Sequence, residues 1–445
     1  MASAAEQLAA NMSFGTFSKA TELKQRLWFT LGALIVYRLG TYIPIPGVDG
    51  AVMAEMMEQH GGGILGMFDM FSGGALRRVT VFALNIMPYI SASIIIQLMT
   101  AAVPTLEALK KEGESGRKKL NQYTRYLTAL IAMFQSYGIA AGLESMHGSF
   151  GAAVLDPGWF FRISCVITLV GGTMFLMWLG EQITARGIGN GQSLIIMAGI
   201  VAGLPGALAS LLELGRTGAL STLFILLFLV LAVATIAAIV YVERAQRRIP
   251  VQYPKRQSGN RMVGGDQTHM PLKINTSGVI PPIFASSLLL IPATIAGFAT
   301  SGPEWFQTIM NQLGHGQPVY MLLYAALIVF FSFFYTAIVF DPVETADNLK
   351  KYGGFIPGIR PGSATAAFFD RILTRLTAVG GIYLVVICML PELLISDYGL
   401  PFYFGGTSIL IVVSVTMDTV TQVQSHLLAH QYEGLIRKNR VKGRR

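Results

Sequence analysis

Long apolar runs divide the chain and set its fold class. Ten of them reach about 18 residues, the length that an α-helix needs to cross the hydrocarbon core of a bilayer. We therefore predict ten transmembrane helices, at 27–44, 79–103, 126–143, 161–180, 188–214, 219–242, 274–298, 319–340, 376–393 and 402–424. Residues 1–26 are mostly polar, so we expect a polar N-terminal segment and not a cleavable signal peptide.

The composition supports a membrane protein. Of the 445 residues, 53% are hydrophobic and 13% are charged. This charged share is about half that of a soluble globular protein, which is too little to cover the surfaces of several soluble domains. The two cysteines, Cys165 and Cys388, lie inside apolar runs, so we interpret them as packing residues and not as a redox pair.

The positions of the basic residues predict the orientation in the membrane. Of the 33 Lys and Arg residues, 28 fall on one side of the ten-span arrangement. Loops rich in Lys and Arg face the cytoplasm, so both termini are expected there. These basic residues lie in the tails 1–26 and 425–445 and in the loops 104–125, 181–187, 243–273 and 341–375.

Loop lengths suggest an internal repeat. Segments 27–214 and 219–424 each hold five predicted spans, and three of the four loops in the first have a counterpart of similar length in the second. Because five is odd, the two halves face opposite ways across the membrane. This arrangement is typical of an inverted-topology repeat, in which the functional site lies between the halves.

Several patterns approach catalytic motifs without completing one. His426 and His430 have the spacing of a zinc helix but lack the glutamate that follows the first histidine. The glycine-rich run 186–191 departs from G-x-G-x-x-G and follows no predicted strand. Gly353 and Gly358 have P-loop spacing without the Lys and Ser or Thr that should follow. We therefore predict no enzymatic activity, no cofactor and no metal.

An ion-coupled secondary transporter is the alternative function. Such transporters keep charged groups near the bilayer midplane to hold substrate or protons. Here the spans contain few such groups, namely Arg38 in span one and Asp418 toward the cytoplasmic end of span ten, where it is expected to reach the interface. The pattern therefore favours a conduit lined by apolar side chains.

Three segments interrupt the regular spans. The outer loop 45–75 holds a short apolar stretch between glycine hinges, which either plugs a cavity or lies as an amphipathic helix on the outer surface. Segments 85–93 and 275–283 mix proline, small residues and polar residues within spans two and seven. We expect Pro88 and Pro281 to kink these helices, either as ordinary packing or as part of a seam that can separate.

Long strings of residues closely resemble the SecY family, the central subunits of the bacterial protein-conducting channel. The most distinctive is Asp-Met-Phe-Ser-Gly-Gly-Ala-Leu at 69–76. The others follow in order and at the expected spacing, at 86–98, 110–117, 180–191, 344–351, 355–362 and 401–408.

This resemblance implies an all-α polytopic membrane protein, with ten transmembrane helices in two inverted five-helix halves around an hourglass pore. The pore would conduct unfolded secretory proteins across the membrane. A lateral gate would release transmembrane segments sideways into lipid. No nucleotide site is evident, so the energy for secretion would come from a partner.

The resemblance also implies roles for particular residues. The plug would be 64–74, with the side chains of Ile64, Leu65, Met67, Phe68, Met70 and Phe71. The pore ring would consist of Ile86, Ile90, Gln192, Ile196, Ile283 and Ile411. Spans two, three, seven and eight would form the lateral gate, with Ser91 and Ile291 facing across it and with Pro88 and Pro281 in its helices.

The cytoplasmic loops 243–273 and 341–375 form the implied docking surface. Membrane topology alone would place Lys and Arg there, but both loops are longer than a connection requires, and Arg360 stands on a tip shaped by Gly and Pro. The candidate docking residues are Arg247, Arg248, Lys255, Arg256, Arg261, Lys350, Lys351 and Arg360.

The resemblance further implies partners and a location. SecE and SecG are the expected small subunits, and SecA and the ribosome are expected to dock on the basic loops. Signal peptides, nascent chains and membrane lipids should contact the channel, and YidC and SecDF are additional candidate partners. The expected location is the bacterial cytoplasmic (inner) membrane.

Gln192 departs from the otherwise isoleucine ring. Its amide brings donors and an acceptor to a constriction that should stay dry, and an unpartnered buried amide costs about 1–3 kcal/mol. The side chain either faces the lumen or points off the ring toward polar neighbours such as Asn190 or Ser193. We expect the second orientation, in which Ile196 seals that side of the pore.

Overall fold

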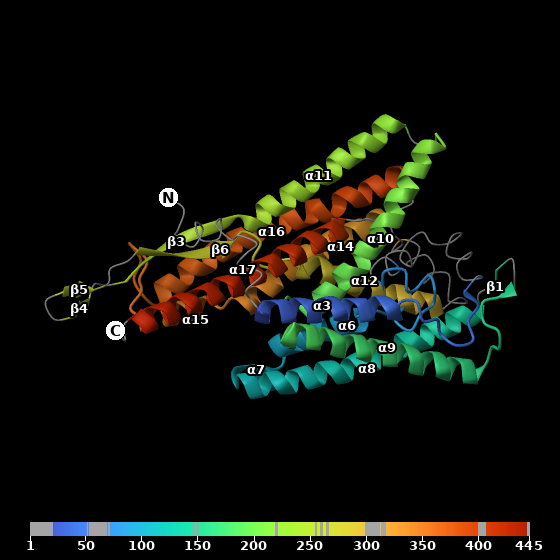
Figure 1. Cartoon of the computed structure of the whole chain (residues 1–445), viewed down its shortest axis with the longest axis horizontal. Coiled ribbons are helices and arrows are strands. Elements are labelled where there is room, and N and C mark those ends of the chain that lie inside the picture. Colours follow the sequence, from blue (N-terminus) through green and yellow to red (C-terminus); the bar gives the residue numbers. More distant parts are fainter. Residues whose placement is uncertain are drawn as a thin grey trace. The chain divides into compact units, whose positions relative to one another are not determined.

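The computed structural model describes residues 21–50, 52, 69, 72–145, 147–148, 151–218, 221–253, 256–258, 261–263, 267–298, 312, 317–398 and 406–442. Most of this chain is helical (Figure 1). The helices are α3 (Thr21–Gly40), α6 (Met87–Ala102), α7 (Pro104–Lys111), α8 (Glu114–Ser145), α9 (Trp159–Arg186), α10 (Gly191–Arg216), α11 (Thr222–Arg244), α12 (Ile280–Phe298), α14 (Pro318–Val339), α15 (Pro342–Lys351), α16 (Ser363–Tyr398) and α17 (Gly406–Lys442).

Short antiparallel strand pairs complete the described fold. The pairs are β1 (His147–Gly148) with β2 (Gly151–Ala152), β3 (Gln246–Gln252) with β6 (Gln267–Lys273), and β4 (Arg256–Ser258) with β5 (Arg261–Val263). The chain divides into two compact units. Unit 1 comprises Met1–Ile96, Arg117–Gly206 and Ile411–Arg445, and unit 2 comprises Gln97–Gly116 and Ala207–Leu410.

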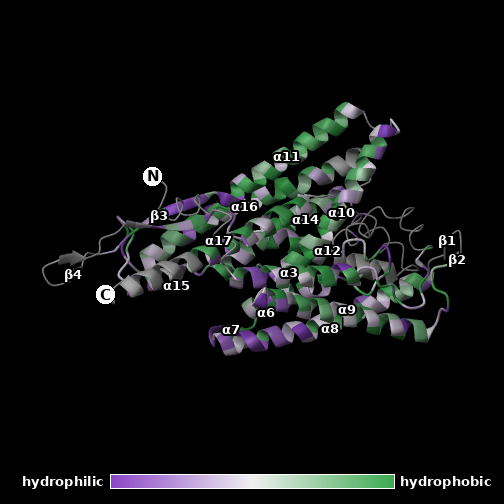
Figure 2. Cartoon of the chain, in the orientation of Figure 1, coloured by the Kyte–Doolittle hydropathy of each residue, from purple (hydrophilic) through white to green (hydrophobic). Residues whose placement is uncertain are grey.

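Each predicted span overlaps a helix, and the structure bears out the membrane character of most of them. Within the described residues, seven helices are long and apolar enough to cross a membrane. The pair α6 and α7, bent by 99°, would count as an eighth span. Helix α11 is the most hydrophobic of these spans, and most of it is green, the colour of hydrophobic residues, in Figure 2. The total of ten stays a prediction, because α3 and α12 fall short of this criterion within the described residues.

The predicted proline kinks are wrong. Helix α6 begins at Met87 and α12 begins at Ile280, so Pro88 and Pro281 each lie in the first turn of a helix. Proline is well tolerated there because the N–H that it lacks would have no partner within the helix. The start of the predicted span 79–103 is also wrong, because turns occupy the residues directly before Met87.

Backbone geometry explains why the helix starts late. Val79 and Asn85 both have left-handed backbones, with φ of 46° and 50°. Asparagine tolerates this region, whereas a β-branched valine adopts it only where the surrounding structure holds it. Here the Ile45 N–H donates to the Val79 carbonyl and the Val79 N–H donates to Leu76, at 2.9 Å each. These bonds keep the segment in turns.

The basic segments and tail contain more regular structure than the sequence analysis expected. The segment 243–273 contains the β3–β6 hairpin, and 341–375 contains α15 and the start of α16. At the C-terminus, α17 continues to Lys442, through most of the predicted tail 425–445.

Two ion pairs join α8 and α9 in unit 1. Arg125 contacts Glu181 at 2.6 Å and Arg162 contacts Glu144 at 2.5 Å. Arg125 near the start of α8 pairs with Glu181 near the end of α9, and Glu144 at the end of α8 pairs with Arg162 near the start of α9. The two helices therefore run antiparallel. Helix α9 also packs against α3.

In unit 2, α14 lies between α12 and α16 and packs against both. The ring of Phe284 on α12 meets Phe331 on α14 edge-to-face, with centroids 5.7 Å apart. Tyr335, one turn further along α14, meets the same ring at 6.3 Å. The predicted gate spans seven and eight are therefore held together by aromatic contacts.

We expect Gly172→Ala to destabilise unit 1, because a Cβ there would overlap the carbonyl oxygen of Val81. Overpacking of this kind costs about 1–3 kcal/mol. The matched control is Gly171→Ala, since a Cβ on Gly171 meets open space. Thermal unfolding of the purified protein in detergent should show a lower midpoint for the first variant only. Equal midpoints for the two variants would contradict the close packing of α9 against the backbone at Val81.

Candidate functional site

The predicted pore-ring residues are mostly buried. Ile86 precedes α6, Ile90 lies on α6, Ile196 on α10, Ile283 on α12 and Ile411 on α17. All five isoleucines are less than 9% exposed. Ile283 belongs to unit 2 and the other four to unit 1. Their assembly into one ring stays a prediction.

Gln192 has a polar partner that the sequence analysis did not name. Its side chain lies within hydrogen-bonding reach of the Tyr89 phenol. Its Cγ also lies against Gly180 of α9, where a Cβ would sit 3.1 Å away. The expected neighbour Asn190 instead accepts a hydrogen bond from the Gln192 backbone N–H, at 3.2 Å. The orientation of Gln192 off the ring stays a prediction.

The glycine-rich run 186–191, which the sequence analysis only compared with nucleotide loops, joins several helices of unit 1. The Ile188 N–H donates to Thr30 Oγ1 on α3 at 3.1 Å. The Gly189 N–H donates to Gln422 Oε1 on α17 at 2.8 Å. Backbone groups of the turn are therefore satisfied by helices that lie far away in the sequence.

Close approach explains the glycines of this turn. The Gly191 N–H donates to Thr184 Oγ1 at 2.9 Å, and a Cβ on Gly191 would overlap the Gly180 carbonyl oxygen. A Cβ on Gly187 would likewise overlap Thr30 Oγ1. Larger residues would separate α9, α10 and α3. Around this turn, Ile188 forms a buried apolar cluster with Leu23 and Leu427.

The six plug side chains named from the sequence lie outside the described residues. Residues 72–74, the described end of the plug segment 64–74, are however hydrogen-bonded to α3. We call these three residues the hinge 72–74. Tyr37 Oη donates to the Ser72 carbonyl at 3.3 Å, and Arg38 Nη1 donates to the Gly73 carbonyl at 2.8 Å. Gly73 has a φ of 68°, which favours glycine. Arg38 therefore holds a backbone turn.

A carboxylate reinforces this hinge. Asp69 Oδ1 accepts from the Arg77 N–H at 2.7 Å, and its carbonyl accepts from Ser72 Oγ at 3.0 Å and from the Gly74 N–H at 2.9 Å. Burial raises the pKa of Asp69, partly offset by the Arg77 and Arg78 charges. The hinge 72–74 is thus fixed at several points.

The predicted gate residues lie on separate helices. Ser91 is buried on α6, at 4% exposure, and Pro88 and Pro281 are buried at the starts of α6 and α12. Ile291 belongs to α12, but its side chain lies outside the described residues. The expected proximity of Ser91 and Ile291 stays a prediction.

A buried acidic residue that the sequence analysis missed anchors the start of α12. Glu243, at the end of α11, is only 7% exposed. Its Oε1 accepts from Asn275 Nδ2 at 2.7 Å, and the same nitrogen donates to the Gly278 carbonyl at 3.1 Å. Ser277 Oγ donates to Asn275 Oδ1 at 3.1 Å. The sequence signal was an acidic residue directly after an apolar span.

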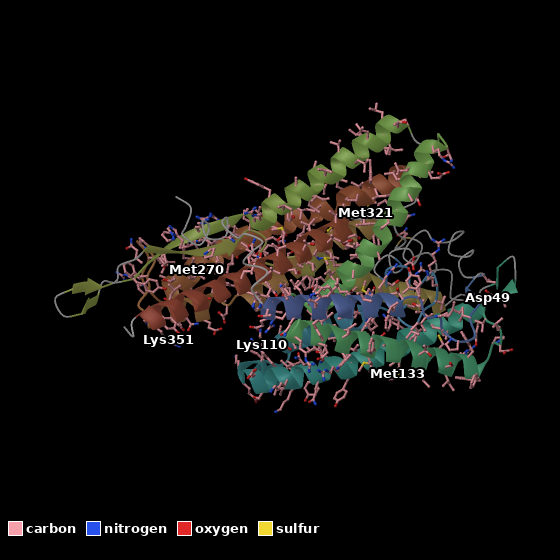
Figure 3. All side chains as sticks on the ribbon, in the orientation of Figure 1. Asp49, Lys110, Met133, Met270, Met321 and Lys351 are labelled. Atoms are coloured by element: carbon pink, nitrogen blue, oxygen red, sulfur yellow. The ribbon has the colours of Figure 1, made fainter. Side chains whose placement is uncertain are left out.

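The two predicted docking loops share one hydrophobic core in unit 2. Gln252, at the end of β3, exchanges backbone hydrogen bonds with Phe355, at 2.9 and 3.0 Å. The core comprises Ile249, Leu272, Ile356, Phe369 and Ile372. Met270 on β6 packs against this core, and Figure 3 labels it together with Lys351 at the end of α15.

The described docking candidates are exposed on this platform. Arg256 and Arg261 lie on β4 and β5 but their side chains, like all of Lys255, lie outside the described residues. The exposed candidates are Arg247, Arg248, Lys350, Lys351 and Arg360. The structure therefore presents cations from two distant segments on one folded support.

The SecY family model matches residues 80–420. The chain belongs to the SecY family. It is 58% identical over 428 residues to the protein translocase subunit SecY of Rickettsia felis, covering 96% of this chain and 99% of that one. It is also 58% identical over 424 residues to the Escherichia coli K12 subunit of the same name, covering 95% and 96%.

Solved structures share the fold of this SecY family member. A protein-conducting channel matches with a TM-score of 0.65 and 18% identity, covering 91% of this chain and 92% of that one. Sec61 in the canine ribosome–channel complex matches with a TM-score of 0.61 and 17% identity, again covering 91% and 92%. The chain is therefore a multi-pass membrane protein with the SecY/Sec61 channel fold.

We expect Tyr37→Phe to loosen the hinge 72–74, because it removes the hydrogen bond to the Ser72 carbonyl without changing side-chain shape. Such a bond contributes about 0.5–1.5 kcal/mol, so the idle open probability should rise about 2- to 10-fold. Single-channel recordings without substrate test this. The control is Tyr126→Phe, at an exposed tyrosine of α8. Unchanged idle opening would show that this bond does not restrain the plug.

Proposed function

We propose that this chain is the pore-forming subunit of a protein translocase. It conducts unfolded secretory proteins across the membrane and releases transmembrane segments into lipid. The observation that carries this proposal is the 58% identity to protein translocase subunits over 96% of the chain. An ion-coupled transporter is less favoured, because Arg38, one of the few charges in the predicted spans, already serves the plug hinge.

The pore wall fits this function chemically. A conduit that passes chains of any sequence gains nothing from side chains that read substrates by hydrogen bonding. The ring of Ile86, Ile90, Ile196, Ile283 and Ile411 would dewet when idle and give way to a passing chain. With Gln192 hydrogen-bonded to Tyr89, its amide would have a partner off the ring, and Ile196 would seal that side.

The plug 64–74 provides a second seal. Its described end is held by Tyr37, Arg38 and Asp69, so movement would be confined to the part before Asp69. The plug can then leave the pore while one end stays attached. Energy for transport comes from partners, and no enzymatic activity is assigned to this chain.

The lateral gate lies between α6 and α12 in this proposal. Ser91 sits among small residues that permit close helix contact. The Glu243–Asn275 bond fixes the start of α12, and Phe284 joins α12 to α14. Helices α12 and α14 would therefore move together. A signal sequence enters by replacing the contact across the seam.

The platform of Arg247, Arg248, Lys350, Lys351 and Arg360 is the proposed docking surface for SecA and the ribosome. Cations on a rigid support suit phosphate-rich RNA and acidic protein surfaces. SecE and SecG are the proposed small subunits, and YidC and SecDF are further candidates. The chain would lie in the bacterial cytoplasmic membrane with both termini in the cytoplasm.

Reconstitution tests the function directly. The chain is placed in liposomes with SecE, SecG and SecA, and protection of a secretory precursor from protease is measured with and without ATP. Protection that requires ATP supports a conduit. Solute-driven currents without precursor protection would instead support the transporter.

The gate assignment predicts that Ser91→Cys and Ile291→Cys together form a crosslink that stops precursor transport. Each single variant serves as a control, and reduction should restore transport. The native Cys165 and Cys388 are free and buried. Full transport through a channel whose crosslinking has been verified would contradict the gate assignment.

The docking assignment predicts that Arg360→Glu lowers SecA-driven transport at least about tenfold, equivalent to about 1.4 kcal/mol of docking free energy. Arg360 is exposed, so thermal stability should not change. The control is Arg371→Glu, at an exposed arginine on α16. Normal transport in the Arg360 variant would restrict its role to the local turn.

A further inference from the structure

Three arginines stand on the side of the membrane that the basic-loop pattern predicts to be outside. Arg38 lies near the end of α3, and Arg77 and Arg78 follow the hinge 72–74. Membrane topology does not account for this cluster, because 28 of the 33 basic residues fall on the opposite side.

The guanidinium groups of Arg38 and Arg78 gather around one exposed phenol. The Arg78 Cζ lies 4.2 Å and the Arg38 Cζ 5.1 Å from the centroid of the Tyr42 ring. Arg38 Nη2 also donates to Tyr42 Oη at 3.2 Å. Arg78 also forms a side-chain hydrogen bond with Tyr42. The local potential is therefore positive.

The hydrogen bonds of Arg38 go to neutral oxygens, and Arg78 bonds the Tyr42 side chain. Arg38 donates to Gly73, Thr41 and Tyr42, and no ion pair within the described chain neutralises Arg38 or Arg78. Asp69 does interact with the Arg78 charge, but the carboxylate is buried and occupied by the Arg77 N–H. Positive charge remains in excess at an exposed surface.

An apolar surface leads up to the two arginines. Ile35 and Leu39 are one turn apart on α3, and both are more than half exposed. Ile43 continues this exposed surface beyond the helix and is 56% exposed. Exposed apolar side chains below, with an aromatic ring and cations at the edge, match the depth profile of a phospholipid.

We propose that Arg38, Arg78 and Tyr42 bind the phosphate of an anionic phospholipid in the outer leaflet, with an acyl chain along Ile35, Leu39 and Ile43. Guanidinium groups suit phosphate because they donate parallel hydrogen bonds in a fixed plane. The Tyr42 hydroxyl adds a donor. The site rests on the predicted membrane orientation and is independent of protein conduction.

The site adjoins the plug hinge through one residue. Arg38 Nη1 holds the Gly73 carbonyl while Nη2 faces Tyr42, so a phosphate can engage the second nitrogen without displacing the first. A bound lipid would therefore restrain the same side chain that restrains the hinge.

A local reporter separates this site from lipid contacts elsewhere. Leu39→Trp is introduced into a full-length chain whose four native tryptophans are replaced by phenylalanine, and the whole complex is reconstituted. Quenching by brominated phosphatidylglycerol is compared with quenching by brominated phosphatidylcholine. We expect phosphatidylglycerol to quench at several-fold lower mole fraction. Equal quenching by the two lipids would overturn the proposal.

Two single substitutions identify the cation. Arg78→Gln should weaken the phosphatidylglycerol preference about tenfold, the loss expected for about 1.4 kcal/mol. The matched control Arg77→Gln removes the same charge one residue earlier and should leave the preference within about twofold. Equal losses in both variants would mean a general charge effect and would overturn the site.

A competition arm identifies the source of the phosphate. Millimolar glycerol 3-phosphate should not remove the preference, because it lacks the acyl chains that contact Leu39. Loss of the preference would mean a free-anion site and would overturn the lipid assignment. A reporter quenched by neither lipid would mean that protein covers this face, which would also overturn it.

Discussion

Backbone polar groups inside a membrane must find partners within the protein, because hydrocarbon offers none. Two described breaks between helices have such partners. At the hinge 72–74, Tyr37 and Arg38 of α3 satisfy the carbonyls of Ser72 and Gly73. In the turn before α10, Thr30 and Gln422 satisfy N–H groups from helices far away in the sequence. A non-helical segment in this protein is therefore also a point where distant helices are joined.

These joints fix particular parts of the molecule. The bonds of Glu243 and Asn275 fix the start of α12, and Phe284 joins that helix to α14 within unit 2. The shared core under β3, β6 and α15 makes one platform from two basic segments. In the proposed channel, the gate and the plug would move while these parts stay fixed.

Much of the fold was predictable from local patterns, whereas the roles of the site residues stay predictions. The apolar runs predicted the membrane spans, and the string at 69–76 was enough to indicate the family. Other features needed the fold. Pro88 and Pro281 looked like kinks because they fall within apolar runs, and the run alone does not reveal where the helix begins. The role of Glu243 could not be predicted from a local pattern, because its partner Asn275 lies 32 residues away.

The sequence by itself determined the class of the protein, most of its membrane spans, its expected orientation and its family, because hydrophobic length and charge are properties of contiguous residues. Only the tertiary structure decided what the polar residues do. Gln192 turns toward Tyr89, Arg38 holds Gly73 and stands beside Tyr42 with Arg78, and the glycines of 186–191 permit helices to approach. Hydrogen bonds and close packing depend on atoms within a few ångströms, and the chain brings those atoms together from positions that no local pattern connects.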